Sequence, residues 1–307
     1  MKKLTFISLV LALLVTACGK KEGAPEKKYR IDDITAVETQ YHDNVLVSTI
    51  DAYVEEDWHW DGNEVYRIDY RSDHPYSENI YYDSRRRIVR TTIPAYNIST
   101  EFAYSDRLLD RIDCYRDDQL FATYTFIHDA DDLLTEIDCH RYPLAGDSNL
   151  IVLPMRANPL TALLGTQLAR PLMARAGRSG AKSASETRYC LTWTDDNVTA
   201  IQCIEGDTTT TVSLTYDSHS NPYNQLFNYR ELNDPIYGFE MLSANNIVTL
   251  RMPYLYYGNT LFTYQYEYDG DCPAKRTLTY SYRGVSNASL DSVTVTCHKT
   301  ETYKYVD

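Results

Sequence analysis

The sequence contains none of the short motifs that mark common catalytic and cofactor sites. It has no nucleophile-elbow serine motif, no HExxH zinc-protease motif and no glycine-rich phosphate or dinucleotide loop. No CxxC pair occurs, and the seven histidines lack the spacing of metal ligands. The sequence therefore predicts no catalytic residue, no metal site and no cofactor, and it gives little support to an enzyme.

Positive charge is scarce as well. The chain has 30 Lys and Arg residues against 43 Asp and Glu residues, which gives a formal net charge of −13 at pH 7. Nucleic-acid-binding proteins instead gather Lys and Arg, because contacts to phosphate dominate their affinity. Nucleic acid is therefore not an expected partner.

Apolar runs long enough to span a membrane as a helix are missing, but a shorter run lies near the N-terminus. Met1-Lys2-Lys3 precedes an apolar stretch from residue 4 to residue 15, and small residues then lead to Cys18. This pattern resembles a bacterial lipobox, which implies a cleaved signal peptide at 1–17 and lipid attachment at Cys18. The alternative is an ordinary cleaved signal followed by an incidental cysteine.

The segment after the cysteine is polar and typical of a flexible tether at 18–30. More than one acyl chain would hold the protein stably on a membrane. Gly19 is not the aspartate that retains similar lipoproteins in the inner membrane, so we expect an outer-membrane lipoprotein. Its domain could face either the periplasm or the cell surface.

Tyrosine is abundant, with 28 residues, and much of it falls in a repeat. Each copy has an aromatic residue, an acidic turn, an aliphatic residue and a strand-like segment. Clear copies span 60–70, 104–114, 128–139 and 193–203, and weaker copies begin at Tyr82, Tyr216 and Tyr268. The short steps between copies suit one β-hairpin per unit.

Alternation of apolar and polar residues supports strands and gives each strand an aromatic face. The prediction is an all-β fold, an antiparallel meander of repeated hairpins curled into a barrel or half-barrel with a short helical or loop insertion. Tyr-rich faces suit a hydrated or protein interior better than the bilayer midplane, so we expect a soluble barrel.

The predicted β-repeat domain covers 31–307, with a first half at 31–142 and a second half at 188–307. Between them, 143–187 turns basic and loses the strand pattern, and leucines recur at helical spacing. This insertion is either a crossover that plugs one end of the fold or a mobile lid or docking helix.

Six cysteines follow Cys18 in a chain expected to leave the reducing cytosol. If Asp196 and Asn197 form a hairpin tip, Cys190 lies opposite Cys203 and the two can form a disulfide. The alternative is two buried free thiols.

Two resemblances concern the repeated units. The segments YDGDCPAKRTL and YDSRRRIVR resemble the YD repeats of Rhs-type and teneurin-like shells. The C-terminal half, with LTYDSHSNPYNQL and FTYQYEYDGDCPAKRTLTYSY, is similar to Gram-negative lipoproteins of unknown function with a porin-like β fold. The similarity covers roughly residues 31–307 and implies a fold but no catalytic residues. Cys272 stands where a YD turn places glycine.

The preferred functional hypothesis is a noncatalytic binding or scaffold module with a Tyr-lined concavity for a glycan or an amphipathic small molecule. One alternative is a structural lipoprotein that docks another envelope protein through its acidic face and the basic segment 156–182. A less favoured alternative is a hydrolase using the segment 55–60. The candidate ligand-binding residues are Trp58, Trp60, Tyr264, Tyr266, Tyr280 and Tyr282.

Overall fold

A computed structural model describes residues 30–70, 75–142, 185–226, 242–255, 258–285 and 292–306. The predicted signal peptide at 1–17, the lipidation site Cys18 and most of the tether lie outside these ranges, as does 143–184. The interpretations of those segments stay predictions.

Sixteen antiparallel strands are found in these ranges, together with two very short helices. No helix in the described part of the chain is long and apolar enough to cross a membrane. The elements are β1 (Ile31–His42), β2 (Val45–Asp61), β3 (Glu64–Tyr70), β4 (Tyr76–Tyr82), β5 (Ile88–Ile93), η1 (Pro94–Tyr96), β6 (Ile98–Ser105), β7 (Leu108–Arg116), β8 (Gln119–His128), β9 (Leu134–Arg141), β10 (Ser185–Thr194), β11 (Asn197–Glu205), β12 (Thr208–Ser220), α3 (Pro222–Leu226), β13 (Asn245–Leu255), β14 (Gly258–Asp269), β15 (Cys272–Val285) and β16 (Ser292–Tyr305).

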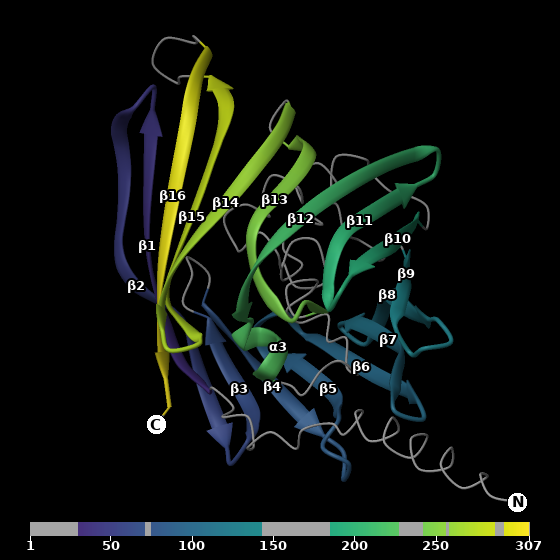
Figure 1. Cartoon of the computed structure of the whole chain (residues 1–307). Helices are drawn as coiled ribbons and strands as arrows, with labels where there is room; N and C mark the ends of the chain where they lie inside the picture. Colours follow the sequence, from purple (N-terminus) through teal and green to yellow (C-terminus); the bar gives the residue numbers. More distant parts are fainter. Residues whose placement is uncertain are drawn as a thin grey trace, which may run out of the picture.

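The strands form a closed barrel in which each strand pairs with its neighbours in the chain (Figure 1). Closure comes from β1 and β16, which pair from Ile31 opposite Tyr305 to His42 opposite Val295. The predicted all-β meander is confirmed, and the sheet is a full barrel rather than a half-barrel. β10 begins at Ser185, within the range 143–187 predicted for the insertion.

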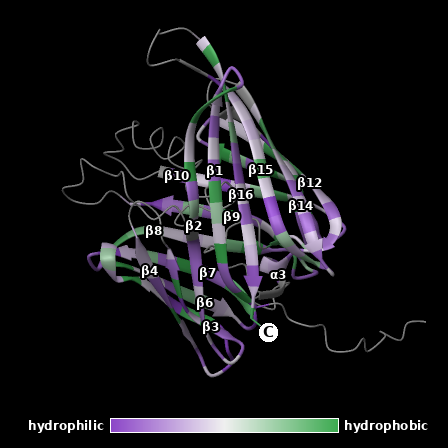
Figure 2. Cartoon of the chain, turned by 90° about the vertical axis from the view of Figure 1, so that its left-hand side faces the viewer, coloured by the Kyte–Doolittle hydropathy of each residue, from purple (hydrophilic) through white to green (hydrophobic). Residues whose placement is uncertain are grey.

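Side chains alternate between the inside and the outside of the barrel, as strand geometry requires. Ile68, Leu109, Ile112 and Ile201 are wholly buried on the inner face, and each contributes roughly 1.5–3 kcal/mol by leaving water. Charged residues intervene on the outer face, where Arg188 pairs with Asp138. Figure 2 shows hydrophilic and hydrophobic residues mixed along the strands in this way.

Acidic residues form many of the hairpin turns. Asp106, Asp118, Asp132 and Asp195 have positive φ, a conformation that Asp tolerates better than most residues. The carboxylate of Asp129 also accepts the backbone N–H groups of residues 131 and 133. The acidic pairs of the repeat are therefore turn residues.

Repeated aromatic residues tie seven of the eight even-numbered strands to the strands that precede them. An indole N–H or a tyrosine hydroxyl near the end of an even-numbered strand donates to a backbone carbonyl near the start of the preceding strand. Donor–acceptor distances run from 2.5 to 2.9 Å. The pairs are Trp60 with Ile31, Tyr82 with Val65, Tyr104 with Ile88, Trp193 with Leu134, Tyr216 with Val198, Tyr266 with Ile247, and Tyr305 with Pro273. We call these bonds the aromatic–carbonyl links.

Two strands depart from the repeat. On β8 the aromatic position is taken by His128, whose pKa is lowered by burial, so that the neutral ring is favoured. On β14 the link comes from Tyr266 and not from Tyr268, the residue that begins the repeat. Tyr268 instead donates to the carboxylate of Asp217 and stacks on His219 at 3.8 Å between ring centroids.

The predicted disulfide between Cys190 and Cys203 is wrong. The turn lies at residues 195–196, and a register shift between Thr192 and Trp193 adds one residue to the ladder. Cys190 is therefore opposite Gln202, and Cys203 is opposite Tyr189. One residue of offset places the two thiols on opposite faces, and all six cysteines in the described ranges are free.

Loss of a single aromatic–carbonyl link should destabilise the barrel measurably. We expect Tyr82→Phe to lower the free energy of unfolding by about 1 kcal/mol, because the Val65 carbonyl loses its donor while the ring stays. The neighbouring Tyr81 is 48% exposed, so Tyr81→Phe serves as the control and should have no measurable effect. Urea unfolding followed by tyrosine fluorescence measures both. Equal effects of the two variants would contradict a role for the link.

Candidate binding site on the inner wall

The six predicted ligand-binding residues all lie on the inner face of one part of the barrel. They come from β2, which adjoins β1, and from β15 and β14, which follow β16 in the order of the strands around the barrel. Trp58, Tyr264 and Tyr280 are buried, while Trp60, Tyr266 and Tyr282 are partly buried and pack against the core. We call the inward faces of β14, β15, β16, β1 and β2 the inner wall.

Aromatic rings two residues apart stack along these strands. The centroids of Trp58 and Trp60 lie 6.1 Å apart, and those of Tyr280 and Tyr282 lie 6.2 Å apart with nearly parallel planes. On β16, Tyr303 and Tyr305 form a similar pair at 6.4 Å. The inner wall thus presents ordered rings.

Several polar atoms of these rings already bond to the protein. The indole N–H of Trp58 donates to Oε2 of Glu56 at 3.0 Å. Trp60 and Tyr266 form aromatic–carbonyl links. The partly buried rings of Trp60, Tyr266 and Tyr282 can therefore supply contact area to a ligand more readily than hydrogen bonds.

Four charged side chains lie among the rings. One of them, Glu55, belongs to the segment 55–60 of the hydrolase hypothesis, and the sequence analysis missed the other three. Nζ of Lys299 lies 2.6 Å from Oε1 of Glu55 and 2.9 Å from Oε1 of Glu301. Arg276 forms an ion pair with the other oxygen of Glu301. All four side chains are at most 12% exposed. We call these residues the charged cluster.

Aromatic rings surround the guanidinium of the cluster. Its carbon lies 5.7 Å from the centroid of Tyr264 and 5.9 Å from those of Tyr223 and Tyr303, within the range of cation–π attraction. Tyr223 is the second residue of α3, where its backbone N–H donates to the side chain of Asn221. This cap holds α3 in place, and Tyr223 reaches Tyr303 with 3.4 Å between hydroxyl oxygens.

The charges in the cluster are not equally compensated. Burial raises the pKa of Glu301, but Arg276 and Lys299 outweigh it and hold the pKa well below its usual range. Burial likewise lowers the pKa of Lys299, and the two glutamates outweigh it and raise the pKa. For Glu55 burial dominates and raises the pKa to about 7, and its Oε2 has no hydrogen-bond partner among the described residues.

Strand alternation divides the segment 55–60 that the hydrolase hypothesis used. Trp58 and Trp60 face inward, whereas Asp57 and His59 face outward. The imidazole is thus separated from the inward carboxylate of Glu56 by the sheet itself. These residues do not form one catalytic site.

The solved structures similar to this chain include two porin-like proteins from Bacteroides. A porin-like protein from Bacteroides uniformis ATCC 8492 has 11% sequence identity and a TM-score of 0.49, covering 90% of this chain and 96% of that chain. A porin-like protein from Bacteroides vulgatus ATCC 8482 has 8% identity and a TM-score of 0.25, covering 90% and 99%. No family model matches this chain, and no curated protein matches it. At these TM-scores the likenesses carry no argument, and the barrel is established by its own strand pairing.

Removal of the central cation should be costly. We expect Lys299→Met to lower the free energy of unfolding by about 3–5 kcal/mol, because Glu55 and Glu301 stay buried without it. Lys304→Met on the same strand is the control. Lys304 is 65% exposed and pairs with Asp33 on the surface, so its loss should change stability little. Denaturant unfolding of both variants tests this. Similar losses of stability in the two variants would contradict the expected cost of leaving Glu55 and Glu301 buried without Lys299.

The contribution of Glu301 should depend on pH. Its pKa is lower in the folded protein than its ordinary value of 4.5, so the folded state binds fewer protons. The resulting stabilisation is complete above pH 4.5 and is lost as the pH falls below it. The stability difference between the wild type and Glu301→Gln, measured by denaturant unfolding, should therefore be smaller at pH 3 than at pH 6. A difference that is unchanged between these two values would contradict the ion-pair account.

Proposed function

We propose that this chain is a noncatalytic binding module of the bacterial cell envelope, anchored to a membrane through a lipid on Cys18. Its inner wall binds a polar ligand, for which a glycan is the best match and an amphipathic small molecule the second. The predicted lipobox at the N-terminus and the charged outer face of the barrel support an anchored, water-exposed domain.

The observation that carries the proposal is the charged cluster among the rings of the inner wall. Ion pairs cost free energy to bury, and apolar residues of similar size are often equally stable in their place. Strongly shifted pKa values such as those of Glu55 and Glu301 are typical of functional sites. A barrel that needed only stability would have little use for four ionisable groups here.

A glycan matches this combination of groups. The C–H face of a sugar ring packs on tyrosine and tryptophan rings, and its hydroxyls bond to carboxylate, ammonium and guanidinium groups. Stacked rings at Tyr280 and Tyr282 lie on the strand that also carries Arg276. The inner wall therefore offers both kinds of contact from adjacent strands.

A second candidate function is the docking of another envelope protein. It is favoured by the start of β2, where Val45, Leu46, Val47 and Ile50 are between 42% and 66% exposed. Apolar side chains gathered on one exposed segment often mark an interaction surface. The basic segment 156–182, which the sequence also suggested for docking, lies outside the described residues.

Ligand binding is tested with the chain from residue 19 onward, screened by thermal shift against glycans and amphipathic small molecules. A true ligand should raise the melting temperature in a concentration-dependent way. Glu55→Gln should then weaken binding about 10–100-fold in calorimetry, since a hydrogen bond to a charged group contributes about 1.5–3 kcal/mol.

The matched control is Glu267→Gln, a change at an exposed glutamate of β14 that pairs with Lys275. It should leave the affinity within about twofold, because no contact to the inner wall is lost. Binding that is equally weak in both variants, or a screen without any stabilising compound, would count against the proposal.

A further inference from the structure

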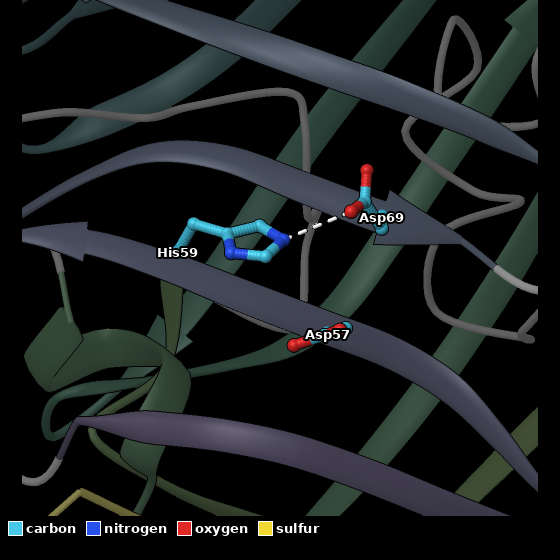
Figure 3. Close-up of side chains that lie close together, drawn as sticks. All are labelled: Asp57, His59 and Asp69. Carbon is cyan, nitrogen blue, oxygen red and sulfur yellow. Dashed lines mark hydrogen bonds and ion pairs between the residues drawn. The ribbon is translucent and has the colours of Figure 1, made fainter.

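An imidazole and two carboxylates converge on the outer face of the barrel, on the far side of β2 from Trp58. Asp57 and His59 lie two residues apart on β2, so their side chains share the outer face. Asp69 on β3 is directly opposite Asp57 in the ladder. One ligand atom from each of the three lies within 4.8 Å of the others. Figure 3 shows the three side chains on their two strands, with the interaction between His59 and Asp69 dashed.

The register places carboxylates side by side across three strands. Asp57 is opposite Asp69 on one side and opposite Asp33 on the other. Like charges directly opposite each other destabilise an antiparallel pair. Asp33 pairs with Lys304 at 3.3 Å and Asp69 with Arg67 at 2.7 Å, and the charge of Arg67 also acts on Asp57. A divalent cation held between Asp57 and Asp69 would attract both carboxylates at once.

Neighbouring side chains orient Asp69 toward the imidazole. Nε of Arg67 and the hydroxyl of Ser77 both donate to Oδ1 of Asp69. Oδ2 lies 2.9 Å from Nε2 of His59. Carboxylates that ligate metals are held in this way by groups outside the coordination sphere.

We propose that Asp57, His59 and Asp69 bind a divalent transition-metal ion, with zinc as the best match. One imidazole nitrogen and two carboxylate oxygens are a donor set that zinc accepts, and calcium or magnesium would favour oxygen alone. On binding, the neutral imidazole of His59 coordinates the metal through Nε2 and carries its proton on Nδ1, so the ion replaces the hydrogen bond to Asp69. With His59 33% and Asp69 19% exposed, the ion reaches the site from solution and keeps open positions for water or a partner's ligand.

The site is independent of the proposed glycan function. It lies on the outer face, whereas the charged cluster and the stacked rings lie on the inner wall. Loss of metal binding would therefore leave the inner wall intact.

The test is a calorimetric titration of the full chain, stripped with a chelator, against zinc chloride. We expect His59→Gln and Asp57→Asn each to abolish one zinc site or weaken it by more than about tenfold, since even changes outside the first coordination shell cost that much. The control is His140→Gln, which alters another outward histidine beside a carboxylate, that of Glu186. The control variant should bind zinc as the wild type does.

A second readout uses cobalt in place of zinc. The wild type and His140→Gln should show the visible absorption of cobalt held in low coordination, and His59→Gln should lose it while its circular dichroism stays that of a β-protein. Failure of the wild type to bind zinc would overturn the proposal. So would equal zinc binding by the wild type and His59→Gln.

Discussion

The closed antiparallel ladder is the constraint on which the rest of this structure depends. Once β1 pairs with β16, no strand has a free edge, and each side chain in a regular strand faces either the interior or the outside. A shift of one residue moves a side chain to the other face of the sheet, so residues adjacent in sequence face opposite sides of the barrel wall. Trp58 joins the core, while Asp57 and His59 on either side of it reach the outer face.

The aromatic–carbonyl links reinforce this ladder where the main chain alone would leave it weakest. Seven of the eight even-numbered strands donate from a ring near an acidic turn to a carbonyl of the preceding strand. This explains why the repeat keeps a tyrosine or tryptophan where any apolar residue could fill space. Phenylalanine would pack equally well at such a position but could not donate, and the ring of His128 shows that the slot also accepts a neutral heteroaromatic.

The sequence was sufficient for features that depend on local periodicity. The hairpin repeat, the inward position of Tyr264 and Tyr280 and the role of aspartate in the turns all follow from spacing and turn preferences. Features that depend on exact register were out of reach, because one bulged residue reverses the faces. The sequence did not reveal the register shift between Thr192 and Trp193, so Cys190 was wrongly expected opposite Cys203.

The charged cluster shows a further limit, which arises from chain closure. Lys299 and Glu55 are 244 residues apart, and no local pattern connects them. They meet because the last strand closes on the first, with β2 next to it. Lys299 and Glu301 are spaced by two from Cys297 and Tyr303 on β16 and share their face, so strand alternation alone could have predicted that they point inward. The site therefore exists only in the closed barrel. A ligand that binds the inner wall would stabilise the closed barrel against unfolding, because it binds that state alone.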